Sequence, residues 1–573
     1  MFLFQLGNPI GFGAGDFIEL AVAAVLALLF MGRAWIERVG SAIARRTGWC
    51  LLLTGGAPLA LRLGLLARRG VPTPGGADDF SYLLLADTLR HFRLANPVHP
   101  MHRFFETIFV LQEPSYASIF PLGQGIALAM GRALFGSPWA GVALSIAIFC
   151  AACYWMLRGW TTPGWALVGG LLAGMEFGPL NQWMNTYWGG AVSATAGCLV
   201  FGALPRLRER GRTRDAVLLG AGLGLELLTR PFESSLLGLC VVFYFALARL
   251  KWRWLSIAAL AALPAVGLTL AQNRAVTGSW TTLPYQASRY QYGVPATFTT
   301  QANPIPHREL TRQQQLDYDL QSAVHGAGRD TVATFFKRLG YRARFYRFFF
   351  LAPLYLALPA FLWRLRERRF AWVCATLGVF ALGTNFYPYF YPHYIAAVAC
   401  LFILVSVAAL EKLNGQVAAI VLTLCAAHFL FWYGVHLCAA DELTRYESWD
   451  YVNIGDPEGR TNIERQLAQE PGKLLVFVRY SPRHVFHEWV HNDADIDGAR
   501  VVWAGDLGAA ENETLRRYYP DRTAWLVEPD ARPPQLSRYE AEKVVVEQTP
   551  APAVKHQKQR PVLRFEEIPK MRN

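Results

Sequence analysis

The feature that most constrains this chain is its series of long apolar segments, separated by short loops rich in arginine. Hydrophobic residues make up 53% of the 573 residues, which is more than a soluble protein of this length normally carries. Such segments indicate helices that cross a membrane several times. The formal net charge is +13. The arginines that contribute to it lie beside these segments, so they mark cytoplasmic loops rather than a nucleic-acid-binding surface.

Pairing each apolar segment with the charges at its ends predicts about twelve spans, with both chain ends on the outer side. Residues 68–137 and 280–346 are then long outer loops, and long loops are usually functional. The most basic loop, residues 206–214, lies inside. The expected spans are residues 17–31, 50–66, 138–157, 166–184, 191–204, 216–228, 235–248, 255–271, 348–362, 371–383, 395–410 and 417–433.

The composition changes near the end of the last span. Short apolar runs that predict buried strands alternate with amphipathic segments, so a small α/β domain on the outer side is expected. The predicted strands are 474–480, 501–504 and 523–527, and the predicted helices are 463–468 and 514–519. The expected division is 1–48 (an extra span and a cytoplasmic loop), 49–436 (the transmembrane domain), 437–549 (the α/β domain) and 550–573 (an extended tail).

Two adjacent carboxylates, Asp78 and Asp79, follow the apolar segment 50–66. They precede residues 82–93, which have an apolar face and a basic end and are predicted to form a helix lying on the membrane surface. Acids at a membrane boundary are costly unless they have a partner or a function. Capping the helix would need only one of them. We therefore interpret Asp78 as a catalytic base and Asp79 as its partner or as a group that positions the acceptor.

Three cations on the outer side are candidate ligands for an anion. Arg230 ends the segment 216–228, where a guanidinium group can either extend to the interface or bind a lipid phosphate. Arg289 and Lys337 belong to an excess of positive charge in the outer loops. That excess runs against the usual inside bias, so it favours an anionic ligand or an anionic lipid surface.

Four short motifs resemble a known pattern in their order and their topology. They are residues 78–82 (DDFSY), 116–125 (YASIFPLGQG), 227–230 (LLTR) and 392–394 (PHY). Together they are similar to GT-C superfamily membrane glycosyltransferases, in particular the protein O-mannosyltransferase, aminoarabinose transferase and RgtA/B/C/D-like group. The resemblance covers roughly residues 50–410. One departure is the outer turn 185–190, which lacks the second acid that many relatives carry there.

The resemblance implies that a sugar is transferred, with inversion, from a polyprenyl-phosphate donor to an acceptor hydroxyl at the outer face of a bacterial inner membrane. Asp78 would act as base and Arg230, with Arg289 and Lys337, would bind the donor phosphate. The missing second acid argues against a metal, so no cofactor is expected. Outer aromatic side chains mostly suit an interfacial belt, but a sugar site also uses flat rings and hydroxyl groups. The candidate substrate-binding residues are Tyr82, Tyr187, Trp188, His393 and Tyr394.

Two other functions remain open at this point. A lipid or sugar transporter would need polar groups at mid-membrane, and the predicted spans hold few. A membrane-anchored zinc protease is suggested by His487, Glu488 and His491, which fit HExxH. That motif requires a long helix, whereas here it lies between Pro482 and a turn-forming Asn492.

The CxxC pair Cys150 and Cys153 lies within an apolar segment, which predicts buried structural thiols.

Overall fold

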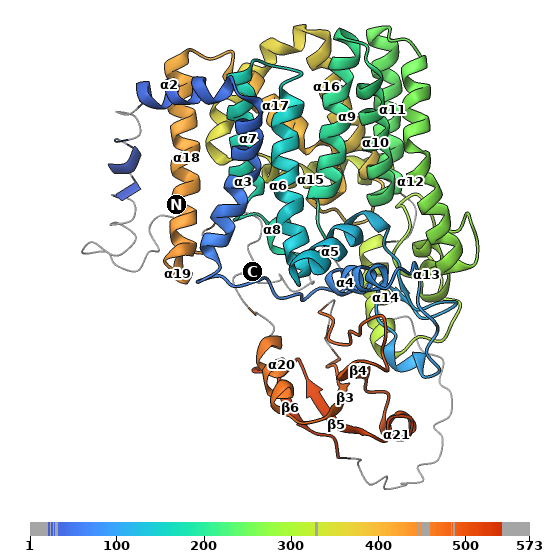
Figure 1. Cartoon of the computed structure of the whole chain (residues 1–573). Helices are drawn as coiled ribbons and strands as arrows, with labels where there is room; N and C mark the ends of the chain where they lie inside the picture. The colour runs from blue at the N-terminus through green and yellow to red at the C-terminus, as the bar shows by residue number, and fades with distance from the viewer. Residues whose placement is uncertain are drawn as a thin grey trace.

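A bundle of long helices carries a smaller α/β domain at one end (Figure 1). The computed structural model describes residues 21–540, with breaks at 23, 27, 29–32, 327–329, 445–446, 448–455, 457–458, 483 and 485–486. The predicted tail 550–573 lies outside the described residues, and so does most of the predicted span 17–31.

The bundle is helical almost throughout, and its helices begin and end close to the predicted spans. Pro138 and Pro163 each occupy the first turn of a helix, where a missing N–H is tolerated. The helices are α2 (Arg33–Ala44), α3 (Thr47–Leu65), α4 (Ala77–Arg90), α5 (Leu122–Phe135), α6 (Pro138–Leu157), α7 (Pro163–Phe177), α8 (Gln182–Asn185), α9 (Ala191–Glu209), α10 (Thr213–Thr229), α11 (Pro231–Ala248), α12 (Arg253–Thr277), α16 (Arg368–Thr384), α17 (Ala399–Leu410), α18 (Gly415–Leu437) and α19 (Asp441–Thr444).

Six helices of the described part are long and apolar enough to cross a membrane. This supports a multi-pass α-helical membrane protein, while the count of twelve spans stays a prediction. The six are Thr47–Leu65, Pro138–Leu157, Pro231–Ala248, Arg253–Thr277, Pro392–Leu410 and Gly415–Leu437.

The predicted span 348–362 is not a regular α-helix, so that prediction is wrong in its detail. The chain there forms three consecutive 3₁₀ segments, η3 (Ala343–Phe349), η4 (Ala352–Leu356) and η5 (Leu358–Arg366). Pro353 and Pro359 lack the N–H groups that an α-helix would use, and their rings obstruct the preceding turn. A further 3₁₀ segment, η6 (Pro392–Val398), leads into α17.

The segment 280–346, which was predicted as an outer loop, contains three helices that were not predicted. They are α13 (Pro284–Tyr292), α14 (Arg312–His325) and α15 (Val332–Arg342). The side chain of Thr311 accepts a hydrogen bond from the amide of Gln314 (3.3 Å) at the start of α14, and Thr331 caps α15 in the same way. The composition of α14 is mostly polar, so its cap marks where the helix begins, whereas α15 also has a clear apolar face.

The α/β domain has a four-stranded sheet in the order β4-β3-β5-β6. The strands β3, β4 and β5 are parallel, and β6 runs antiparallel to β5. The three predicted strands lie within two residues of β3, β4 and β5, while the predicted helices 463–468 and 514–519 overlap longer helices, α20 and α21. The elements are α20 (Arg460–Gln469), β3 (Lys473–Val478), β4 (Val501–Gly505), α21 (Ala509–Tyr518), β5 (Arg522–Glu528) and β6 (Gln535–Arg538).

The helix predicted over residues 82–93 to lie on the membrane surface is α4, which begins earlier, at Ala77, ends at Arg90 and is largely covered by protein. Ten of its 14 residues are buried, because α5 packs on one face and the α/β domain on another. Leu84 joins a buried cluster with Phe477 and Val502 of the sheet. The adjoining outer segment contains η2 (His102–Phe105) and a short antiparallel pair, β1 (Val110–Leu111) and β2 (Ala117–Ser118).

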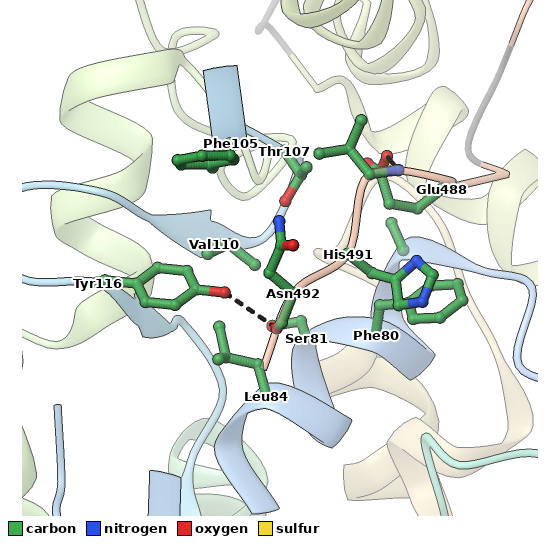
Figure 2. Close-up of a pocket in the computed structure, with 12 residues that line it drawn as sticks. Phe80, Ser81, Leu84, Phe105, Thr107, Val110, Tyr116, Glu488, His491 and Asn492 are labelled. Atoms are coloured by element: carbon green, nitrogen blue, oxygen red, sulfur yellow. Dashed lines mark hydrogen bonds between the residues drawn. The ribbon is translucent and has the colours of Figure 1, made fainter. Parts of the chain in front are cut away.

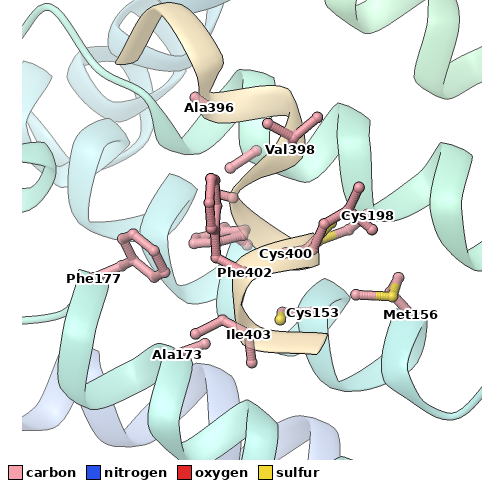
Figure 3. Close-up of a cluster of buried hydrophobic side chains, with 14 of the residues drawn as sticks. Cys153, Met156, Ala173, Phe177, Cys198, Ala396, Val398, Cys400, Phe402 and Ile403 are labelled. Carbon is pink, nitrogen blue, oxygen red and sulfur yellow. The ribbon is translucent and has the colours of Figure 1, made fainter. Parts of the chain in front are cut away.

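The core of the bundle is densest around α17, whose 12 residues are all buried. Figure 3 shows Cys153, Cys198 and Cys400 packed there beside Phe402. Cys150 and Cys153 are buried and form no disulfide, which confirms the prediction of structural thiols. A Cβ on Gly197 of α9 would lie 1.7 Å from the carbonyl oxygen of Ala397, so only glycine permits this close approach of α9 to η6.

Candidate functional site

The two acids occupy the first turn of α4, directly after the N-cap residue Gly76. Unpaired amide N–H groups and the helix dipole favour negative charge at this place. Successive side chains on a helix point about 100° apart. Asp78 and Asp79 therefore face different surroundings, and they make different contacts.

Asp79 is buried and is held by backbone amides. Its Oδ1 accepts a hydrogen bond from the amide of Tyr187 (2.9 Å), and its Oδ2 accepts one from the amide of Gly75 (3.3 Å). The hydroxyl of Tyr187 in turn donates to the carbonyl oxygen of Pro72 (2.9 Å). These contacts join the turn after α8 to the start of α4, so they favour a positioning role for both Asp79 and Tyr187.

Replacing Asp79 with Ala should lower the free energy of unfolding by about 1–3 kcal/mol, because two buried amides would lose their acceptor. Thermal or denaturant unfolding of the purified protein in detergent measures this. Asp521→Ala removes an acid that is 59% exposed and serves as the control, with a change near zero. An Asp79→Ala protein as stable as the wild type would show that these hydrogen bonds contribute nothing.

Asp78 differs because its carboxylate accepts no hydrogen bond from the other described side chains and keeps part of its surface exposed. The pKa of Asp78 is raised to about 7. Burial is the main cause and the neighbouring Asp79 adds to it, while Arg230 opposes the shift. A carboxyl group with a pKa near neutrality, one oxygen face open and a cation opposite is suited to accept a proton.

Arg230 lies between α10 and α11 and faces the same space. Its Cζ is 4.6 Å from the ring centre of Tyr394, and its Nη1 is 3.9 Å from Oε1 of Glu233. Glu233 also accepts a hydrogen bond from the hydroxyl of Tyr387 (3.3 Å). In the described part of the chain the guanidinium group of Arg230 makes no hydrogen bond, so its N–H donors remain available for an anionic ligand.

Aromatic residues of the turn 385–394, together with Trp188, form an aromatic wall beside Asp78 and Arg230. Trp188 lies 5.5 Å from His393 and 5.5 Å from Tyr391, measured between ring centres. Trp188 Nε1 and His393 Nδ1 are buried and have no hydrogen-bond partner among the described residues. Buried unsatisfied polar atoms are uncommon in folded proteins, and a bound ligand is one explanation for them.

Tyr389 and Tyr391 belong to this site, although the sequence analysis treated them as members of an interfacial belt. Burial and the nearby Asp78 carboxylate raise the pKa of both phenols, so they stay protonated and can donate hydrogen bonds. The signal for them was the alternation of tyrosine and proline in residues 387–394. An aromatic belt has the same composition, so composition alone did not separate the two roles.

The other predicted residues, Tyr82, Arg289 and Lys337, differ in how closely they approach this site. Tyr82 stacks on Phe120 at 4.3 Å, and burial raises its pKa to about 12, with Arg230 opposing. Arg289 is close enough to Tyr389 to interact with it electrostatically, but it donates to the carbonyl oxygens of residues 295 and 296. Lys337 lies on the exposed side of α15, and no contact in the described structure joins it to this group.

The HExxH segment does not form the helix that a zinc protease requires. His487 instead forms a β-bridge with Gly76, and Glu488 accepts a hydrogen bond from the hydroxyl of Tyr480 (2.6 Å). The described residues contain no group of three or more His, Cys, Asp and Glu side chains placed to hold a metal ion. The geometry of this segment therefore argues against the protease interpretation.

No family model and no curated protein matches the chain. Among solved structures it is similar to ArnT from Cupriavidus metallidurans in the apo state, with 15% identity and a TM-score of 0.47 over 84% of this chain and 93% of that one. ArnT bound to undecaprenyl phosphate gives 14% and 0.45 over the same shares. The Archaeoglobus fulgidus oligosaccharyltransferase in complex with Zn and sulfate gives 14% and 0.41 over 82% of this chain and 67% of that one.

Those proteins are members of the GT-C superfamily, which the sequence motifs also resemble.

Proposed function

We propose that this protein is a membrane glycosyltransferase that moves a sugar from a polyprenyl-phosphate donor to an acceptor hydroxyl. The observation that carries the proposal is the pairing of Asp78, an acid that accepts no hydrogen bond from the other described side chains, with Arg230, a cation whose side-chain donors make no hydrogen bond in the described part of the chain. The two side chains interact electrostatically, and Tyr394 lies close to both. The helix α4, which carries Asp78, lies at the end of the bundle that carries the α/β domain (Figure 1).

Arg230 is the proposed ligand of the donor phosphate. A guanidinium group offers paired donors that match two phosphate oxygens, and its charge does not depend on pH. As the bond between the sugar and the phosphate breaks, negative charge grows on the bridging oxygen. A cation already in place stabilises that charge without reorganisation.

Asp78 is the proposed general base. It would remove the proton from the acceptor hydroxyl while the acceptor oxygen attacks C1 of the sugar from the side opposite the phosphate. One displacement of this kind inverts the configuration at C1. The remaining rate enhancement comes from holding donor and acceptor in line.

The aromatic wall is the proposed contact surface for the sugar and the isoprenoid. Trp188 and His393 provide flat faces and two unsatisfied ring nitrogens, while Tyr389 and Tyr391 provide hydroxyl groups. Because Arg230 and these aromatics lie at one end of membrane-crossing helices, the phosphate can stay at the headgroup level while the isoprenoid chain stays in the bilayer. We place this end on the outer face of a bacterial inner membrane.

The test is to compare cells with and without this protein for their lipid-linked sugars and surface glycans. Loss of the protein should cause the polyprenyl-phosphate sugar to accumulate and one class of glycan modification to disappear. Unchanged pools of both would contradict the proposal. The accumulated donor would also identify the sugar.

The rate of transfer should rise with pH through about 7, because Asp78 must be deprotonated to act and its pKa is raised to about 7. A free aspartate would be fully active above roughly pH 5. The measurement is kcat/KM between pH 5 and 9 in lipid nanodiscs. A flat profile across this range would exclude Asp78, with this pKa, as the base.

A further inference from the structure

The α/β domain contacts the catalytic turn itself. His487 forms a β-bridge with Gly76, and the amide of Glu488 donates to the carbonyl oxygen of Gly75 (3.2 Å). The amide of the same Gly75 donates to Asp79 (3.3 Å). A segment more than 400 residues later in the chain thus fixes Gly75 and Gly76, which precede Asp78 by three and two residues.

Arg460, at the start of α20, holds that segment against α4. Its side chain is almost completely buried, and its Cζ lies 4.5 Å from the ring centre of Phe80 and 4.5 Å from that of Trp489. Its Nη2 donates to the carbonyl oxygen of Glu488, and its Nη1 lies 3.1 Å from Nδ1 of His491. Phe80 follows Asp78 by two residues, so Arg460 touches the catalytic helix directly.

The residues of the HExxH motif serve this contact. Oε1 of Glu488 accepts hydrogen bonds from the hydroxyl of Tyr480 (2.6 Å) and from the amides of Trp489 and Val490 (3.0 Å each). Burial and the neighbouring Arg460 lower the pKa of His491 to about 3, which keeps its ring neutral beside the guanidinium group. The ring stacks near Phe80, with 4.5 Å between the ring centres.

The far end of α4 is held by the same domain. The amide of Ala494 donates to Oδ2 of Asp87 (3.0 Å), and the hydroxyl of Tyr116 donates to the carbonyl oxygen of Asn492 (3.0 Å). Figure 2 shows Phe80 beside His491, and the hydrogen bond from Tyr116 to Asn492. The helix is therefore fixed to the domain at both ends.

We infer that the α/β domain positions the catalytic carboxylate, through a clamp formed by Arg460 and residues 487–491 on the turn that precedes Asp78. This inference rests on the proposed function of Asp78. Arg460 is a positioning residue, because it contacts the turn and not the reacting atoms. Misplacement of a catalytic group by about 1 Å can cost a factor of about 100 in rate, so a loosened clamp lowers kcat.

The test is Arg460→Met in the full-length protein, with Arg517→Met as matched control. Arg517 lies on α21, and its side chain is 79% exposed. Arg460→Met should lower kcat about 10- to 100-fold, leave the donor KM within about twofold because Arg230 is untouched, and shift the rise of activity to lower pH because water gains access to Asp78. Arg460→Lys keeps the charge but loses the planar fork, so it should give a smaller effect in a protein that still folds.

Hydrogen–deuterium exchange of the peptide covering residues 75–82 supplies a readout that does not depend on transfer. Exchange should be at least about tenfold faster in Arg460→Met than in the wild type or in Arg517→Met. Unchanged exchange together with unchanged kcat in both Arg460 variants would overturn the clamp. Faster exchange in a protein whose wild type transfers no sugar would support the clamp and refute the proposed function instead.

Discussion

Asp78→Asn is expected to lower the rate of sugar transfer by at least about 100-fold, because a general base contributes roughly 10²–10⁴ in rate. Asparagine has nearly the same shape and can stay at the start of α4, but it cannot accept the proton of the acceptor hydroxyl. The measurement is single-turnover transfer with purified protein and a fixed donor concentration. Donor binding should change little, since Arg230 remains in place.

The same variant should be at least as stable as the wild type above pH 7. The fold raises the pKa of Asp78 from 3.8 to about 7, so the folded state disfavours the charged form. The stability that the group contributes is complete below its unfolded pKa and is lost as pH rises through the folded pKa. Thermal unfolding at pH 8 should therefore show an equal or higher Tm for Asp78→Asn, and the difference should disappear near pH 4.

Asp79→Asn separates chemistry from structure at the neighbouring position. The asparagine side chain cannot accept hydrogen bonds from both of the backbone amides that donate to Asp79, so this variant should lose stability. An Asp78→Asn protein that transfers at the wild-type rate would remove Asp78 from the reaction. An Asp78→Asn protein as unstable as Asp79→Asn would assign it a structural role.

The helices of the bundle could be predicted because their apolar length and flanking arginines both follow from the cost of burying polar groups in lipid. The strands of the α/β domain could be predicted for a related reason. The residues of β3 are buried from Leu474 to Val478, which requires an unbroken apolar run. Both signals come from residues that are neighbours in the chain, so they can be seen in a single sequence.

The 3₁₀ segments at residues 343–366 and the helices within residues 280–346 were not predicted, because they depend on single residues. Pro353 and Pro359 interrupt an otherwise apolar segment, whereas the capping side chains of Thr311 and Thr331 mark where α14 and α15 begin. Windows of hydrophobicity average over such positions. The burial of α4 was missed because it depends on the α/β domain, whose position relative to α4 has no local signal.

The site shows the same division. Asp78 was chosen because an acid at a membrane boundary is costly without a partner or a function, and Arg230 because a guanidinium group at the end of a span can bind a phosphate. The different contacts of Asp78 and Asp79 depend on which amides approach from the turn after α8, and only the assembled bundle shows this. Arg289 and Lys337 were chosen for their charge alone. The fold uses Arg289 to hold a loop and leaves Lys337 exposed.

Arg230→Met is expected to raise the donor KM by about 100-fold or more, because each hydrogen bond between charged groups contributes about 1.5–3 kcal/mol. It should also destabilise the protein by about 3–5 kcal/mol, since the buried Glu233 would lose its cation. A loss of activity in this single variant is therefore ambiguous. Arg230→Lys restores the charge but not the paired donors, so it should recover stability and only part of the donor affinity.

The double variant Arg230→Met with Glu233→Gln resolves the ambiguity. Removing the unpaired carboxylate should return the free energy of unfolding to near the wild-type value, because the hydroxyl of Tyr387 can still donate to the glutamine. Binding of polyprenyl phosphate in nanodiscs should nevertheless stay about 100-fold weaker. If the double variant recovers both stability and binding, then Arg230 only neutralises Glu233, and the phosphate must be held by another group.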